Sequence, residues 1–328
     1  MLSRRRFVAA LAAVPVAKAT ITSAGAADWP SRSVHILYPY AAGSTGDVTT
    51  RLIADQLSKS FGQPFVVENR VGANGIVAAG GVARSPPDGY SLLLATTPQI
   101  EISPVMTKVP YDPVRDFVPI SAISMNSFAL VVNAKLPVKS LAEFIGYARS
   151  QSKGFAYAEA GVGSIPHLAM AMLLDRAGIS GINVSYNGTQ PALTDVVSGH
   201  LPATFGLLGD ALSQGRNGTV RLLAVSSERR SPLQPELPTI AESGFPDYRA
   251  VSWWGLMAPA GTPKAIVDQI ALQVGRAVKD QKIVEQMTAF GIEPLGNSPA
   301  DFAAMISADI DLWKKAVKVT GLEFHQVR

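Results

Sequence analysis

A recurring order of apolar strand, glycine-containing loop and helix constrains the fold of this chain more than any other feature of its sequence. The first instance combines a strand-length apolar run at 34–38, a loop at 40–47, and apolar positions at helical spacing from Val48 to Gly62. Further elements are expected as strands at 65–67 and 90–95 and as a helix at 72–83. Strands that alternate with helices predict an α/β unit whose strands run parallel.

The same order restarts downstream, which predicts a second α/β unit in a chain of 328 residues, long enough for two domains. Its strands are expected at 128–132, 155–158, 183–186, 203–207 and 220–225, and its helices at 140–149, 167–177 and 192–199. The last segment has a strand-like run at 251–258 and two helices near 264–279 and 299–319, each opened by a capping hydroxyl before a proline. We expect this segment to return to the first unit. No repeat of fixed period is present, which argues against solenoids and propellers.

The first 27 residues have the pattern of an export signal. A basic start at Arg4–Arg6 precedes an apolar run at 7–16, and 24–26 supplies the small residues that a signal peptidase requires. The string Ser-Arg-Arg-x-Phe resembles a twin-arginine signal, and Lys18 after the apolar run fits that route, whereas the residues after the phenylalanine depart from it. The general secretory route and a buried N-terminal helix are the alternatives. We expect a cleavable signal peptide and a periplasmic protein.

The charge of the remaining chain is balanced, because four of the 29 basic residues lie in the first 27 positions and 25 acidic residues face the other 25. A protein that neutralises many phosphates needs a concentrated positive field, so a nucleic-acid partner is not expected. The absence of cysteine excludes disulfides, thiolate zinc sites and cysteine nucleophiles. No later stretch approaches 18 uninterrupted apolar residues, so no membrane span is expected.

Three strand-to-helix loops, at 40–47, 160–167 and 186–191, carry most of the chemical information. Small residues let the backbone approach a ligand, and a capping Ser or Thr opens the helix, whose free N–H groups can bind a carboxylate without lysine. In an open α/β sheet such loops lie at the carboxyl ends of strands, where ligands bind. Similar loops also serve only to close the backbone, but three of them over two units favour a ligand site. No dinucleotide fingerprint is present, since Pro166 stands where the third glycine belongs. No P-loop is present either, because no Lys-Ser or Lys-Thr pair follows a glycine-rich loop.

Catalytic interpretations are weak. Ser164 and His167 are three residues apart, but no Gly-x-Ser-x-Gly elbow surrounds the serine and no acid is assigned to orient the histidine. The other histidines form no metal-ligand spacing. We therefore expect no enzyme activity, no cofactor and no metal. The pair Trp253-Trp254 is interpreted as packing at a domain junction, with a cleft wall as the alternative.

Several motifs in order closely resemble the Bug-type receptors, the extracytoplasmic solute-binding proteins of tripartite tricarboxylate transporters. They are Gln63-Pro-Phe-Val-Val-Glu-Asn-Arg70, Gly72-Ala-Asn-Gly75, Pro87-Asp-Gly-Tyr-Ser-Leu-Leu94, Tyr111-Asp-Pro-Val-Arg-Asp-Phe117, Pro191-Ala-Leu-Thr-Asp195 and Trp254-Gly-Leu-Met-Ala-Pro-Ala-Gly-Thr-Pro263. The resemblance covers essentially the whole chain after the signal segment.

The resemblance implies a two-lobed type II periplasmic-binding-protein fold of the α/β class, a Venus flytrap with the ligand cleft between its lobes. We expect a signal peptide at 1–27, a first lobe at 28–124 and 251–328, and a second lobe at 125–250. The ligand is expected to be a small organic carboxylate, delivered to membrane transporter subunits by a monomeric receptor. A receptor that presents its bound form to a sensor kinase is the first alternative, and a Ser/His hydrolase the second.

The residues expected to bind the ligand are Tyr40, Ala42, Gly43, Ser44, Asp47, Thr96, Thr97, Gly163, Ser164, His167, Tyr186, Gly188 and Thr189. Two departures from the family pattern bear on the ligand. Asn187 stands where a lysine is common, and Gly206 and Leu207 replace an acidic or amide pair. Because an ammonium group needs a carboxylate partner, the second departure favours a plain or aromatic carboxylate over an amino acid.

Overall fold

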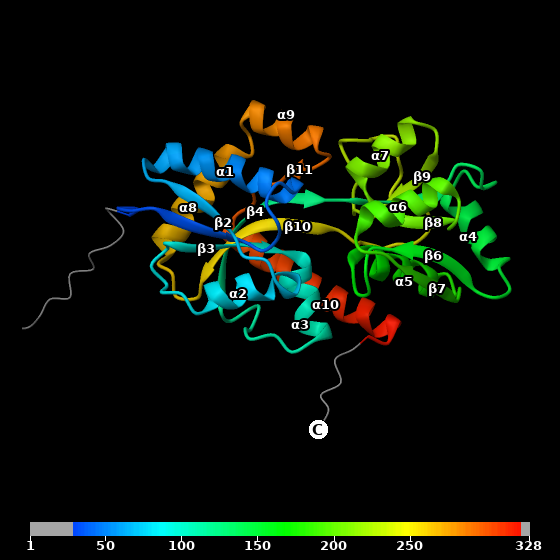
Figure 1. The fold of residues 1–328 in the computed structure, drawn as a ribbon, viewed down its shortest axis with the longest axis horizontal. Helices are drawn as coiled ribbons and strands as arrows, with labels where there is room; N and C mark the ends of the chain where they lie inside the picture. Colours follow the sequence, from blue (N-terminus) through cyan, green and yellow to red (C-terminus); the bar gives the residue numbers. More distant parts are fainter. Residues whose placement is uncertain (1–28, 323–328) are drawn as a thin grey trace, which may run out of the picture.

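The computed structural model describes residues 29–322, so the expected signal peptide at 1–27 lies outside the described residues. Two β-sheets form the framework (Figure 1), with strand orders β11-β4-β10-β3-β1-β2 and β7-β6-β8-β5-β9. The strands of the first sheet are β1 (Val34–Tyr38), β2 (Phe65–Asn69), β3 (Ser91–Thr96), β4 (Phe117–Asn126), β10 (Ser252–Pro259) and β11 (Glu293–Pro294). Those of the second are β5 (Phe128–Asn133), β6 (Phe155–Glu159), β7 (Gly181–Ser185), β8 (Ala203–Leu207) and β9 (Val220–Val225).

Helices connect these strands and cover both faces of each sheet. Around the first sheet they are α1 (Thr45–Phe61), η1 (Ala73–Gly75), α2 (Ile76–Ala83), η2 (Pro98–Ile102), α3 (Ser103–Met106), α8 (Lys264–Ala277), α9 (Gln281–Ala289) and α10 (Pro299–Thr320). Around the second sheet they are α4 (Leu141–Arg149), α5 (Ile165–Arg176), α6 (Thr189–Ser198) and α7 (Leu208–Arg216). None of the helices within 29–322 combines the length and apolar character that a membrane span requires.

The two sheets share one plan. Each begins with three parallel strands, β2-β1-β3 and β7-β6-β8. The next strand, β10 or β5, is antiparallel to both of its neighbours and comes directly after the chain has crossed from the other sheet. The expectation of parallel strands therefore holds for the first three strands of each sheet, and the crossing strand makes both sheets mixed.

Four buried apolar clusters fill the space between sheets and helices. In the first sheet, one face packs against α1, α8 and α9, and the opposite face packs against α2 and the first half of α10. In the second sheet, one face packs against α4 and α5, and the other against α6 and α7. Each sheet thus has its own core on both faces, which is what a two-lobed α/β protein requires.

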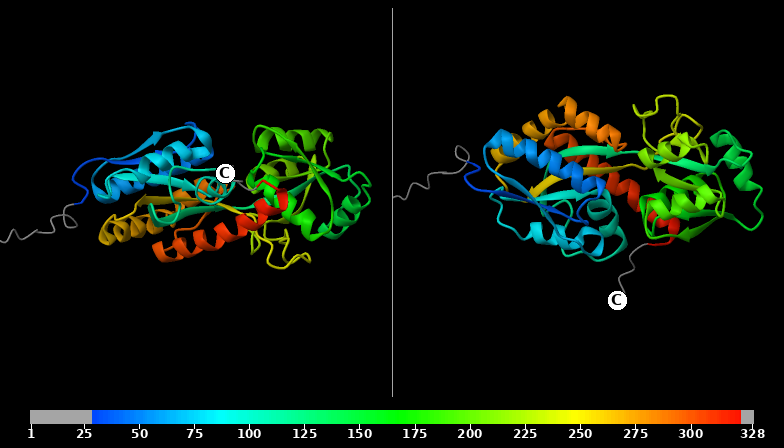
Figure 2. Two further views of the ribbon diagram at one scale, coloured as in Figure 1. Left: turned by 90° about the horizontal axis from the view of Figure 1, so that it is seen from below. Right: turned by 45° about the horizontal axis from the view of Figure 1, so that its top comes forward.

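Three segments join the two bodies, as Figure 2 shows. The chain crosses once between β4 and β5 and once between β9 and β10, and α10 reaches from the first body to the second. Trp313 of α10 lies in the core of the second body, and its indole N–H donates to Glu101 of η2 at 3.0 Å. The indole of Trp253 donates to the other carboxylate oxygen of Glu101 at 2.8 Å. The buried Glu101 therefore ties both crossing elements, β10 and α10, to η2.

Candidate functional site

Two adjoining cavities lie between the sheets, at the carboxyl ends of β1, β3, β6 and β8. The larger has a volume of about 830 Å³ and the smaller one of about 290 Å³. Tyr40, Leu207 and Trp254 line both cavities, so together they form one cleft with two chambers. This is where the topology of open α/β sheets places a ligand.

The N-terminus of α1 lines the smaller chamber through Ser44, Thr45 and Gly46. Ser44 caps the helix: its hydroxyl accepts from the Asp47 N–H and shares a 2.8 Å hydrogen bond with the Tyr38 hydroxyl. Within the described part of the chain, the N–H groups of Thr45 and Gly46 meet no hydrogen-bond acceptor. A Cβ at Gly46 would lie 2.5 Å from the Tyr38 hydroxyl oxygen, so glycine is required for this close approach.

Asp47 fixes this loop through hydrogen bonds. Its carboxylate accepts from the Gly43 N–H at 3.0 Å, from Asn69 at 2.9 Å and from two guanidinium nitrogens of Arg51. Burial alone would raise the pKa of Asp47, but the Arg51 guanidinium and the N–H donors outweigh it and lower the pKa. Asp47 is therefore an ionised, nearly inaccessible anchor.

The loop before α5 is built on the same plan. The buried Glu159 at the end of β6 accepts from the Gly161 N–H, and Ser164 caps α5. His167, only 5% exposed, accepts the Gly163 N–H on Nδ1 at 3.1 Å. Burial lowers the pKa of His167, and the nearby Glu159 charge opposes that shift only in part. A neutral imidazole therefore supports the loop, while Gly163 and Ser164 line the larger chamber.

The third helix N-terminus belongs to α6. Gly188 and Thr189 line the larger chamber, and no side chain caps this helix. Tyr186, just before them, points its hydroxyl to the Asp195 carboxylate, and this bond raises the pKa of Tyr186 to about 12. Tyr186 thus fixes the loop against α6.

The structure brings part of the sequence-predicted set to the cleft. The residues that line it are Tyr40, Ser44, Thr96, Gly163, Ser164, Gly188 and Thr189. The residues that do not are Ala42, Gly43, Asp47, Thr97, His167 and Tyr186. Thr97 instead accepts the backbone N–H of Trp253 at 2.9 Å. Contact between any of these residues and a ligand stays a prediction.

Other lining residues were not anticipated. Ile76, Ile102 and Met106 give the larger chamber an apolar wall, completed from the second body by Phe128 and Leu207. Their apolar character in a buried segment is also typical of core residues, so no sequence signal distinguishes them. The smaller chamber contains Asn126 and Asp210, of which Asp210 lies one turn beyond the Gly206-Leu207 pair. Trp254 forms a cleft wall, whereas Trp253 is buried at the junction of the two bodies.

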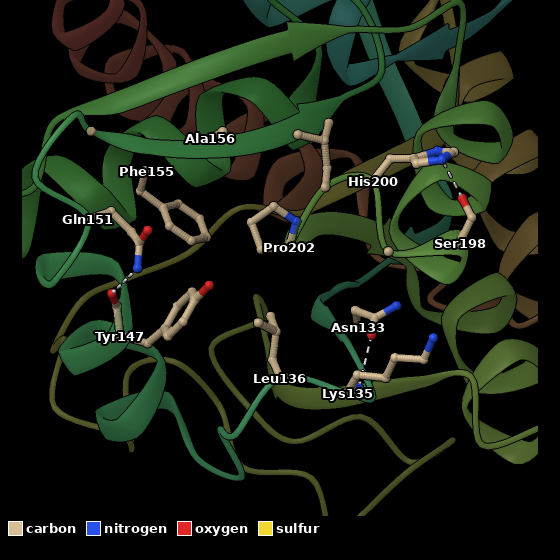
Figure 3. A pocket seen from close by; sticks show the side chains of 13 residues that line it. Asn133, Lys135, Leu136, Tyr147, Gln151, Phe155, Ala156, Ser198, His200 and Pro202 are labelled. Atoms are coloured by element: carbon tan, nitrogen blue, oxygen red, sulfur yellow. Dashed lines mark hydrogen bonds between the residues drawn. The ribbon is translucent and has the colours of Figure 1, made fainter.

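Another hollow lies at the opposite ends of the second sheet's strands, beside the start of β6 and the end of β5 (Figure 3). Asn133, a polar residue that lines this hollow, already has hydrogen-bond partners within the protein. Asn133 donates to the Val196 and Val197 carbonyls and accepts from the Lys135 N–H. No helix N-terminus of the described chain opens into it, so we do not assign the ligand to this hollow.

A comparison with protein families decides what kind of protein carries this cleft. The model of the tripartite tricarboxylate transporter family receptor matches residues 49–322. The chain belongs to this family. Its members are solute-binding receptors rather than enzymes, as expected from the sequence.

Relatives agree with this assignment. The receptor is 33% identical to protein BugT of Bordetella pertussis, over 93% of this chain and 95% of BugT. It superimposes with a TM-score of 0.76 on the Rhodopseudomonas palustris protein Rpa4515 with adipate, at 35% identity, covering 89% of this chain and 98% of that one. The periplasmic binding protein BugD gives a TM-score of 0.71 at 31% identity, covering 90% and 99%. The predicted family, the two-lobed periplasmic-binding-protein fold and the function as a solute-binding receptor are thereby confirmed.

Proposed function

We propose that this receptor captures a small organic carboxylate in the cleft and delivers it to the membrane subunits of a tripartite tricarboxylate transporter. Two lobes, 28–124 with 251–328 and 125–250, close on the solute. The structure of the relative Rpa4515 is one with adipate, which is a carboxylate. This supports the proposed class of solute. Export by the signal at 1–27, with the twin-arginine or the general route, would bring the monomeric receptor to the periplasm.

The observation that carries the proposal is the meeting of three helix N-termini in one cleft. α1 comes from the first body, α5 and α6 come from the second, and their first residues line the two chambers. Free N–H groups and the positive end of the helix dipole bind anions. A carboxylate held by both bodies would draw them together, since each N-terminus gains its acceptor only when the solute is bound.

Within this proposal, the lining residues Ser44, Gly163, Ser164 and Thr189 contact the carboxylate, and Tyr40 and Thr96 contact the rest of the solute. Asp47, His167 and Tyr186 act by holding the loops in place, through the hydrogen bonds described above. Gly43 presents its N–H to Asp47 and so contributes to loop geometry.

The test is a thermal-shift screen of organic acids at one pH, followed by calorimetry of the positives. A solute that binds only the folded protein raises its unfolding temperature with concentration. We expect carboxylates to stabilise the receptor and their amides, which lack the charge, to have no effect. Equal stabilisation by acids and amides, or by neither, would contradict the proposal.

A further inference from the structure

The smaller chamber presents two buried or half-buried side-chain acceptors, Asn126 and Asp210, opposite the free N–H groups at the N-terminus of α1. Asn126 is only 3% exposed and lines the chamber, and its side-chain carbonyl oxygen has no partner. The amide nitrogen of Asn126 is occupied, because it donates to the Ser252 hydroxyl at 3.4 Å. A buried carbonyl oxygen without a donor is costly, and a ligand that supplies an N–H or O–H removes that cost.

Asp210 adds a carboxylate to the same chamber. It lies in the first turn of α7 and is half-buried, with the Gln190 side chain as its hydrogen-bond partner. Among residues 29–322 no Lys, Arg or His forms an ion pair with it. Burial raises the pKa of Asp210, and the hydrogen bond with Gln190 opposes that shift only in part. The described residues that line the two chambers likewise include no Lys, Arg or His.

Aromatic rings complete the chamber. Tyr38, Tyr40 and Trp254 line it, and the rings of Tyr38 and Tyr40 pack edge to face with centroids 5.9 Å apart. Aromatic faces attract cations, most strongly that of tryptophan. The Asp210 carboxylate, the unpaired Asn126 oxygen and the aromatic walls all favour a positively charged group with N–H donors. The free N–H groups of α1 in the same chamber favour the carboxylate of the solute.

We propose that the smaller chamber binds an ammonium group of the solute through Asp210 and Asn126, so that the receptor takes amino carboxylates. This inference rests on the proposed function, since the solute's carboxylate is held by the helix N-termini. It revises the preference for a plain or aromatic carboxylate inferred from Gly206 and Leu207, because Asp210 supplies the acid that those positions lack. A second carboxylate on the solute would be repelled by Asp210, because the two charges have the same sign. A hydroxyl in place of the ammonium group would leave the negative charge of Asp210 without a positive partner.

The test compares solutes of equal length by calorimetry: hexanoate, adipate and 6-aminohexanoate, and in parallel 2-hydroxyhexanoate and 2-aminohexanoate. We expect one of the two amino compounds to bind at least about tenfold tighter than its partners without the ammonium group, since a hydrogen bond between charged groups exceeds a neutral one by that order. Asp210→Asn should abolish this preference and leave the affinity for hexanoate within about twofold.

Asp301→Asn is the matched control, because Asp301 also lies in the first turn of a helix, α10, but is exposed and outside the cleft. It should leave every affinity unchanged. If no organic acid of the thermal-shift screen binds the parent protein, the proposed function fails. If the screen finds a solute but neither amino compound binds, the function stands and the ammonium site is overturned. If hexanoate or adipate binds as tightly as both amino compounds, or if Asp210→Asn weakens all solutes equally, the function stands and the ammonium site is overturned.

Discussion

Gly209 and Gly291 pack backbone against backbone across the cleft, Gly209 from α7 and Gly291 from the residues directly after α9. A Cβ added at Gly209 would lie 2.7 Å from the Cα of Gly291 and 2.8 Å from the Phe290 carbonyl oxygen. Both glycines line the smaller chamber. The two bodies therefore meet here without any intervening side chain.

Gly209→Ala should push α9 away from α7 and lower solute affinity, because the added methyl group cannot fit at the present separation. Calorimetry against the best solute of the screen measures the effect. Gly146→Ala is the control, since Gly146 lies in α4 and a Cβ there meets no atom within 4 Å. It should raise the free energy of unfolding by about 0.5–1 kcal/mol and leave affinity unchanged. Parental affinity in Gly209→Ala would show that the contact does not limit closure.

Ser164→Ala should weaken both the fold and solute binding, because Ser164 caps α5 and lines the cleft. Ser140→Ala removes an equivalent cap from α4. The hydroxyl of Ser140 accepts the Glu143 N–H at 3.2 Å and lies outside the cleft. Each variant should lose about 0.5–2 kcal/mol of stability in urea unfolding. Only Ser164→Ala should also lose affinity, and equal affinities in the two variants would remove Ser164 from the solute site.

Most strands were predictable because they are buried apolar runs of strand length, and α1, α4, α5 and α10 were predictable because a serine caps each of them. The cap expected from Thr262 before α8 is wrong, because its hydroxyl donates to the Pro259 carbonyl instead. β4 was missed, since Ser121, Ser124 and Asn126 interrupt its apolar pattern. These polar groups are buried through tertiary contacts, such as the 2.8 Å hydrogen bond from Ser121 to the Asn297 carbonyl. The expected helix at 72–83 begins only at Ile76, because Ala73 and Asn74 have positive φ.

The candidate site was predictable only as far as local signals reach. Glycine and a capping serine identify the loops at 40–47 and 160–167 from sequence alone. Sequence spacing does not show whether the side chains of Asp47 and His167 bind a solute or their own loop. In the structure, both accept a hydrogen bond from a backbone N–H of their own loop. Asp210 comes to line the same chamber as Tyr40 and Asn126 only through the approach of the two bodies, which no local pattern encodes.

Acid pH should destabilise the receptor through His167. Its folded pKa is lowered, mainly by burial, whereas in the unfolded chain histidine titrates near about 6.5. Between these values the unfolded state binds more protons, so stability falls as the pH drops below about 6.5. His167→Asn keeps an oxygen acceptor near the Gly163 N–H without titrating. Urea unfolding from about pH 7 to about pH 5 should show a flatter profile in this variant than in the parent, and parallel profiles would exclude His167 as the cause.

The export route can be tested in the signal segment, which lies outside the described residues. Replacing Arg4 and Arg5 with lysine should block export if the twin-arginine route is used, because that route reads paired guanidinium groups and not charge alone. Fractionation of cells that express the parent and the variant measures this. Normal periplasmic accumulation of the variant would assign the protein to the general secretory route.

The position of β10 sets an order in which the receptor can fold. β10 lies between β3 and β4, yet it follows β4 by more than a hundred residues, whereas the second sheet is built from the single segment 128–225. A growing chain therefore possesses every strand of the second sheet before the gap in the first can close. Until residues 252–259 are synthesised, β3 and β4 each have an unpaired edge that can pair with a neighbouring chain. A truncated chain that ends before β10 is therefore prone to aggregate through β3 and β4.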